Sequence, residues 1–164
     1  MLNLKIGNYL KLILFISLIS IISAYYIEYV LGHKPCNLCL IERIPYGLSI
    51  FVIIMNFFFK KDQKFLILLL ILIFIFSFTI SVYHYGIEQG FFQESALCGL
   101  KNSAEIITKE ELLEHLSKNT ISCKDVTFRI FGLSLSTINI GLNLFLIILS
   151  IKTFINYEKF KNSN

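Results

Sequence analysis

The chain has 164 residues, 55% of them hydrophobic and only 16% charged, and its mean hydropathy is +0.71. This composition excludes an ordinary soluble domain and indicates an integral membrane protein. The formal net charge of +4 comes from basic residues clustered beside the apolar segments, so it does not indicate a nucleic-acid partner.

Four segments are apolar enough to cross a bilayer, which takes roughly 20 residues of helix. We expect transmembrane helices at about residues 10–31, 44–59, 65–83 and 131–152, with lysines and tyrosines reaching the membrane interfaces at their ends. The first helix is expected to stay as an anchor, since large apolar residues occupy the positions where signal-peptide cleavage needs small ones. The sequence therefore predicts an all-α membrane protein, a four-helix transmembrane bundle forming one domain over residues 1–164.

Basic residues predict the orientation of these helices. Lys5 and Lys11 lie before or at the start of the first helix, three lysines lie between the second and third, and three more lie at or beyond the end of the fourth. Because cytoplasmic loops carry the excess of Lys and Arg, both termini are expected in the cytoplasm. The loops at about 32–43 and 84–130 are then external.

The shorter external loop ends in a CxxC motif made by Cys36 and Cys39. A disulfide between them would close a very small ring and restrain the unfolded chain little, so the motif suits thiol exchange or metal binding better than stapling. A helix entry at residues 40–44 would aim backbone N–H groups at Cys39 and stabilise its thiolate. Arg43 lies at the membrane boundary, where it either snorkels to phosphate or polarises a carbonyl oxygen of a ligand.

The outer end of the third helix carries polar side chains at membrane depth. His84 and Glu88 are spaced i, i+4, and Gln89 follows them. These groups either hydrogen-bond a ligand or cap the helix at the interface.

The longer external loop contains a helix signal and the second cysteine pair. The capping box at residues 108–111 predicts a short amphipathic helix from about 109 to 118, lying on the membrane surface or against a partner. Cys98 and Cys123 flank it, so all four cysteines are external, in a compartment where disulfides persist. This pair is either a structural disulfide or an exchange partner of the CxxC motif.

A polar stripe marks the fourth helix. We expect it to hydrogen-bond to neighbouring helices. Its residues are Ser134, Ser136, Thr137, Asn139 and Asn143.

Zinc binding is a competing interpretation of the cysteines. The CxxC thiolates could complete a tetrahedral site with Cys98 and Cys123, or with His33 or His84. Zinc ribbons usually pair one CxxC with another or with closely spaced histidines, whereas the second pair here is widely split. The spacing therefore favours redox chemistry and predicts no metal.

Three segments resemble one protein family. Cys36-Asn-Leu-Cys39-Leu-Ile-Glu-Arg43 resembles the CxxC-x-x-x-Arg signature of DsbB-type disulfide bond formation proteins. Residues 83–90 resemble the segment after the third helix of that family, and residues 131–134 the stretch after its last loop cysteine. The resemblance spans nearly the whole chain. It departs from the family pattern before Cys98, where no proline is present.

The resemblance implies a multi-pass protein of the bacterial inner membrane with both cysteine pairs in the periplasm. It implies a quinone-dependent thiol–disulfide oxidoreductase that reoxidises a periplasmic thioredoxin-fold (DsbA-like) dithiol oxidase and passes the electrons to ubiquinone or menaquinone. Lipid, quinone and this oxidase are the expected partners, and no nucleic acid.

Residue roles follow from the same resemblance. The partner's thiolate would attack Cys98, with Cys123 as its disulfide mate, and Cys36 with Cys39 would form the inner pair. Cys39 would contact the quinone ring and Arg43 would stabilise charge on its oxygen. The candidates for further quinone hydrogen bonds are His84 and Gln89.

Two alternatives stay open at this point. A vitamin K epoxide reductase-type enzyme shares the four-helix CxxC design but usually carries its outer cysteine pair before the CxxC helix, an order that this chain lacks. A non-catalytic four-span assembly protein with structural disulfides would keep its activity when Cys36 and Cys39 both become Ser.

Overall fold

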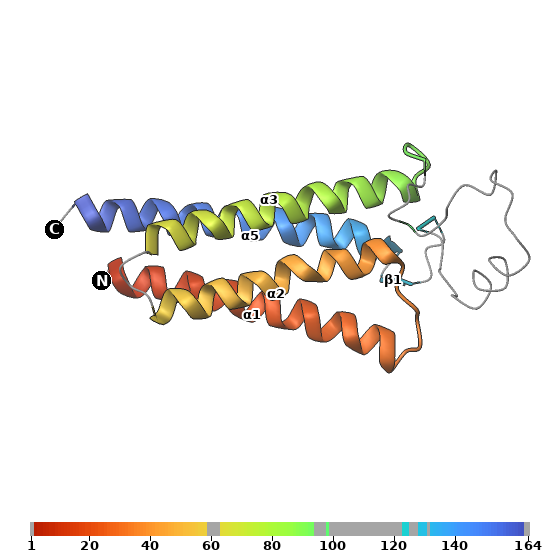
Figure 1. Cartoon of the computed structure of the whole chain (residues 1–164), viewed down its shortest axis with the longest axis horizontal. Coiled ribbons are helices and arrows are strands. Elements are labelled where there is room, and N and C mark those ends of the chain that lie inside the picture. Colours follow the sequence, from red (N-terminus) through yellow and green to blue (C-terminus); the bar gives the residue numbers. More distant parts are fainter. Residues whose placement is uncertain are drawn as a thin grey trace, which may run out of the picture.

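A computed structural model describes residues 2–58, 63–93, 98, 123–124, 128–130 and 132–162. In this part of the chain four helices are long and apolar enough to cross a membrane. They are α1 (Leu2–Tyr29), α2 (Asn37–Phe58), α3 (Gln63–Glu88) and α5 (Leu135–Asn162). The helices lie side by side as a bundle, in which α1 and α3 each contact both α2 and α5 (Figure 1). The predicted four-helix transmembrane bundle is confirmed.

The start of α2 differs from the sequence prediction. The apolar run begins only after the charged residues Glu42 and Arg43, so the sequence predicts a start at residue 44. The helix instead begins at Asn37. A helix can include such residues at membrane depth when other helices supply partners for them, which a hydropathy pattern does not reveal. Pro45 therefore lies inside α2, where it removes one backbone hydrogen bond.

A small hairpin leads into α5. Strand β1 (Arg129–Ile130) pairs antiparallel with β2 (Leu133–Ser134), and Arg129 lies opposite Ser134. Gly132 in the turn has a φ of 83°, a conformation that favours glycine. The turn explains why the helix begins at Leu135 and not at 131.

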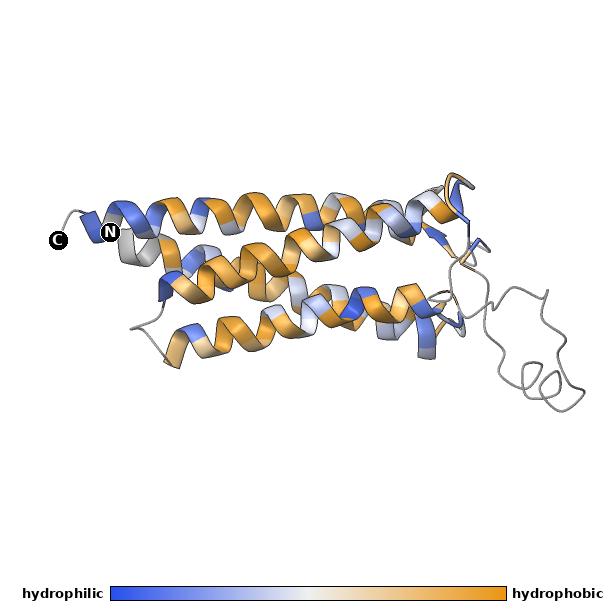
Figure 2. Ribbon diagram, turned by 45° about the horizontal axis from the view of Figure 1, so that its top comes forward, coloured by the Kyte–Doolittle hydropathy of each residue, from blue (hydrophilic) through white to orange (hydrophobic). Residues whose placement is uncertain are grey.

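Apolar residues make up most of the middle of the helices, and polar residues collect towards the ends of the bundle (Figure 2). Large residues such as Phe15, Phe51 and Phe76 are more than half exposed, as expected for contact with lipid chains. Small polar side chains lie inside, where Ser49 donates a hydrogen bond of 3.0 Å to Ser17 across the α1–α2 contact. This pattern is typical of packing between membrane helices.

The polar stripe of α5 bonds to its neighbours as predicted. The Asn139 side chain donates to Glu42 of α2 and to Ser81 of α3, both at 2.9 Å. Ser136 donates to Glu88 of α3 at 2.5 Å. These bonds fix the register of α5 against α2 and α3 at the end of the bundle that carries the hairpin.

Both chain termini lie at one end of the bundle, and the α1–α2 connection and the hairpin lie at the other (Figure 1). The loop helix predicted at about 109–118 lies outside the described residues. So does most of the loop predicted at 84–130.

Candidate functional site

The CxxC motif lies at the first turn of α2. Cys36 precedes the helix directly, and its Sγ accepts a hydrogen bond of 3.3 Å from the backbone N–H of Cys39. The two Sγ atoms are 2.6 Å apart, so the pair can close a disulfide with little movement. The expectation that the helix N-terminus favours the thiolate of Cys39 is wrong. Because α2 begins before residue 40, the N–H of Cys39 in its first turn bonds to Cys36 Sγ instead.

The environment of Cys36 favours a thiolate. The hydrogen bond with Cys39 lowers the pKa of Cys36 to about 4, and the neighbouring His84 acts in the same direction, although burial opposes both. Cys36 lies just before the membrane-spanning segment that begins at Asn37, whereas Cys39 lies within it. The reduced pair is therefore prepared for exchange through Cys36.

This thiolate gives a spectroscopic prediction. A lowered pKa means that the deprotonated form persists at neutral pH and is lost only on acidification towards about 4. We expect a reduced variant carrying Cys98→Ser and Cys123→Ser to show thiolate absorbance in the near ultraviolet at neutral pH, and the further change Cys36→Ser to remove it. Loss of the absorbance near the ordinary thiol value of 9.0 would contradict the prediction.

A buried histidine joins the CxxC motif to two carboxylates. The Nε2 atom of His84 lies 3.5 Å from Cys36 Sγ, and its Nδ1 atom lies 3.1 Å from Glu42 Oε1. Glu88, one turn further along α3, places Oε1 at 3.7 Å from Nε2. All three side chains are at most 10% exposed. At such burial ionisable groups need partners, and here they supply one another.

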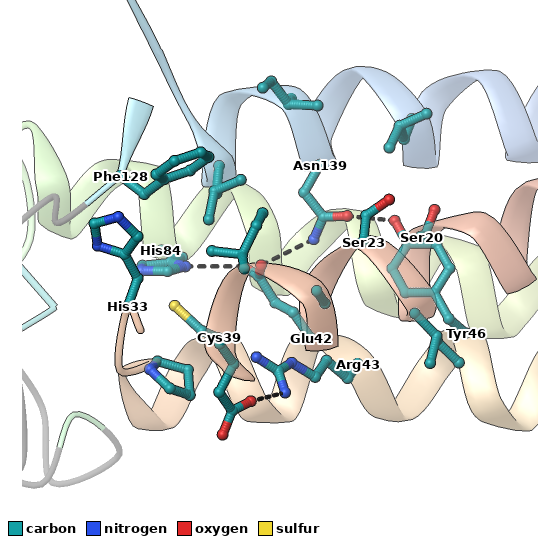
Figure 3. Close-up of a pocket in the computed structure, with 18 of the residues that line it drawn as sticks. Ser20, Ser23, His33, Cys39, Glu42, Arg43, Tyr46, His84, Phe128 and Asn139 are labelled. Atoms are coloured by element: carbon teal, nitrogen blue, oxygen red, sulfur yellow. Dashed lines mark hydrogen bonds and ion pairs between the residues drawn. The ribbon is translucent and has the colours of Figure 1, made fainter. Parts of the chain in front are cut away.

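Hydrogen bonds from two helices hold Glu42 in place. Besides the contact with His84, its Oε2 atom accepts the bond from Asn139, whose own oxygen accepts from the Tyr46 hydroxyl (Figure 3). The sequence interpretation gave Glu42 no role of its own. The sequence feature that could have indicated its role is the adjacent pair Glu42 and Arg43 at the edge of an apolar run.

Arg43 points towards α1. Its guanidinium forms an ion pair with Glu28 and lies over the Tyr25 ring, 5.1 Å from the ring centroid. The Arg43 side chain is only 16% exposed, so it is held between helices and does not extend into solvent. The sequence gave Glu28 no role and placed Tyr25 only at the membrane interface, because only the fold brings α1 beside the start of α2.

These groups line one cavity of about 470 Å³. Aliphatic side chains from α1 and α5 form much of its wall, and Cys39, Glu42 and Arg43 lie on the α2 side (Figure 3). Its volume falls within the range of about 300–1,000 Å³ that is common for small-molecule sites. His84 lines this cavity, whereas Gln89 lies beyond the end of α3, is exposed and does not line it.

The second cysteine pair packs against the first. Cys98 and Cys123 form a disulfide with Cα atoms 5.8 Å apart. Both are buried, at 0% and 3% exposed, in one apolar cluster with Cys36, and Cys123 also lines the cavity. Although the sequence places this pair in a polar external loop, the fold buries both cysteines and brings the two pairs together.

Comparison with known proteins gives a consistent result. The family model described as "Disulfide bond formation protein DsbB" matches residues 8–153. The chain is 30% identical over 138 residues to an uncharacterized protein, RP370, of Rickettsia prowazekii (strain Madrid E), a match that covers 81% of this chain and 78% of that relative. No solved structure gives a significant match.

Proposed function

The chain belongs to the DsbB family of disulfide bond formation proteins, and from this premise we propose that it carries electrons from a thioredoxin-fold dithiol oxidase to a membrane quinone. Family membership gives it disulfide oxidoreductase activity, and its four spans make it a multi-pass membrane protein. The observation that carries the proposal is the apolar cluster that brings both cysteine pairs together beside one cavity, which Cys36, Cys39 and Cys123 line.

The first half of the reaction is exchange at the outer pair. A thiolate of the reduced partner attacks Cys98, the bond to Cys123 breaks, and Cys123 leaves as a thiolate. The partner's second thiolate then resolves this mixed disulfide, so the partner leaves oxidised and Cys98 becomes a thiolate. Because Cys98 is 0% exposed, partner binding has to displace it from the cluster before the first attack.

The second half regenerates the outer disulfide. The Cys123 thiolate attacks Cys36, the CxxC disulfide opens, and Cys39 becomes a thiolate. Cys98 then attacks the mixed disulfide and restores its bond to Cys123, which leaves the inner pair reduced. The packing of Cys36 beside Cys123 supports this order, since exchange requires sulfur atoms that approach directly.

The cavity suits a quinone ring. It is largely apolar, lies beside the membrane-spanning helices and places Cys39 and Arg43 in its wall. A bound ubiquinone or menaquinone would accept the two electrons and two protons of the inner dithiol. Arg43 supplies positive charge for the quinone oxygen, and His84 supplies a hydrogen-bonding ring at the same wall.

The orientation forms part of the proposal. We place both termini in the cytoplasm and both cysteine pairs on the periplasmic side of the bacterial inner membrane. The clustering of lysines near the termini supports this arrangement, since the α1–α2 connection lies at the opposite end of the bundle (Figure 1).

Replacing Arg43 tests the quinone site. A hydrogen bond to a charged group contributes about 1.5–3 kcal/mol, so Arg43→Met is expected to raise the KM for a soluble quinone by about 10- to 100-fold. Lys34→Met is the matched control. Lys34 also lines the cavity but is exposed, so this substitution removes the same charge from the edge of the cavity. An equal effect of both substitutions would contradict a specific role for Arg43.

The direct test of the proposal is stoichiometry. Purified protein should reduce one quinone for each disulfide formed in the partner. Partner oxidation without quinone reduction would remove the proposed acceptor while leaving the disulfide oxidoreductase activity in place.

A further inference from the structure

The cavity wall holds three atoms that can bind a metal ion. The proposed electron transfer does not need these three atoms to act together. Cys36, Cys39 and His84 each offer one such atom, and all three atoms lie within 4.8 Å of one another. Zinc takes thiolate sulfur at about 2.3 Å and imidazole nitrogen at about 2.0–2.1 Å, which places tetrahedral ligand atoms roughly 3.5 Å apart. The distance of 3.5 Å from Cys36 Sγ to His84 Nε2 already has this value.

The surroundings orient these atoms as in a metal site. Glu42 contacts Nδ1 of His84 at 3.1 Å and leaves Nε2 directed at the sulfur. A carboxylate on the distal nitrogen of a metal-binding histidine fixes the ring and strengthens it as a ligand. The Cys39 N–H bond to Cys36 Sγ stabilises charge on that sulfur.

Glu88 lies beside this group but is not part of it. Its Oε1 atom lies 3.7 Å from His84 Nε2, and its other oxygen accepts from Ser136. The Sγ atoms of Cys36 and Cys39, now 2.6 Å apart, are the pair that has to separate. Reduction of the CxxC bond permits that separation, because the two sulfurs are then no longer covalently joined.

We propose that the reduced CxxC pair, together with His84, forms a binding site for a thiophilic divalent cation such as Zn²⁺, and that oxidation of the pair abolishes it. Binding joins Zn²⁺ to the sulfurs of both cysteines as thiolates, and any thiol proton still present is released to solvent. A disulfide offers no thiolate, which makes the site dependent on redox state. On the proposed function, the bound cation withholds the inner dithiol from quinone and inhibits turnover reversibly.

Zinc binding can be measured without quinone or partner. The probe is Zn²⁺ in competition with a chromophoric chelator, and the full-length protein carries Cys98→Ser and Cys123→Ser so that only the inner pair responds. We expect one zinc per reduced protein, and at least about 100-fold weaker binding after oxidation. Equal affinity in the two redox states would overturn the proposal.

Variants and spectroscopy identify the ligands. Glu42→Gln is expected to weaken zinc binding by about 10- to 100-fold, and His84→Gln by at least as much. His33→Gln is the control, because His33 lines the same cavity but lies outside the group of three and should leave the affinity unchanged within about twofold. X-ray absorption of the unsubstituted site tests the ligands even if a variant fails to fold, with two sulfurs and an imidazole expected. A zinc shell without sulfur would overturn the proposal.

The two proposals fail separately. Redox-dependent zinc binding without quinone reduction leaves the metal site standing and removes the proposed acceptor. Quinone reduction that zinc does not affect, in a protein that binds no zinc when reduced, removes the metal site alone.

Discussion

Replacing Cys39 by Ser is expected to lower quinone-dependent turnover by at least about a thousandfold. Cys39 and Cys36 react as one pair, so the loss of either sulfur removes nearly all of the catalysed rate. Cys39 lies in the cavity wall, and without its sulfur the inner disulfide cannot form. Partner oxidation should then stop after the first exchange. Turnover of reduced partner with a soluble quinone measures the effect.

A thermal-unfolding measurement distinguishes this loss of turnover from a loss of folded structure. A CxxC disulfide closes a very small loop, so its removal should change the midpoint of thermal unfolding little while activity disappears. The variant with both Cys36→Ser and Cys39→Ser should be equally inactive. Unchanged activity of that double variant in the cell would instead support a non-catalytic protein with structural disulfides.

Replacing Cys98 by Ser is expected to lower partner oxidation by a similar factor, at least about a thousandfold, but by a different route. The partner then has no sulfur to attack at the outer pair. A small dithiol that enters the cavity can still reduce the inner disulfide, so quinone reduction by dithiothreitol should fall far less. Comparing the turnover rates with reduced partner and with dithiothreitol shows whether the two cysteine pairs have separate roles.

Covalent trapping gives the matched control for Cys98. A partner variant that keeps its attacking cysteine and lacks the second thiol should form a mixed disulfide with the wild-type protein and none with the Cys98→Ser variant. Stability alone does not decide this case, because a disulfide across a sequence separation of 25 contributes roughly 3.5 kcal/mol in the loop-entropy description. Equal loss with both reductants would contradict separate roles for the two pairs.

The sequence predicted the architecture because hydropathy alone specifies membrane spans. The number of spans, the CxxC motif and the polar stripe of the fourth helix all follow from local pattern, and Asn139 bonds to neighbouring helices as expected. The start of α2 could not be predicted in the same way. Glu42 is tolerated there because His84 and Asn139 contact it from two other helices. Such compensation depends on tertiary contacts between residues far apart in the chain.

The site shows the same division. Arg43 was recognised from its spacing after the CxxC motif, but its partner Glu28 on α1 carries no local signal. Polarity made His84 and Gln89 equal candidates, yet only His84 turns into the bundle, since Gln89 follows the last residue of α3. The burial of Cys98 was also missed, because a polar loop sequence does not reveal what packs over the helix ends.

Electron flow from partner to quinone through the two cysteine pairs is tested most directly by anaerobic oxidation of a reduced thioredoxin-fold partner, with the purified protein and a soluble quinone as the sole acceptor. Quinone loss is followed optically, and partner disulfide is counted by thiol alkylation. We expect one quinone reduced per disulfide formed, with no partner oxidation beyond the protein's own disulfides when quinone is absent. Sustained partner oxidation without quinone, or quinone reduction unaffected by Cys39→Ser, would contradict electron flow through the two cysteine pairs.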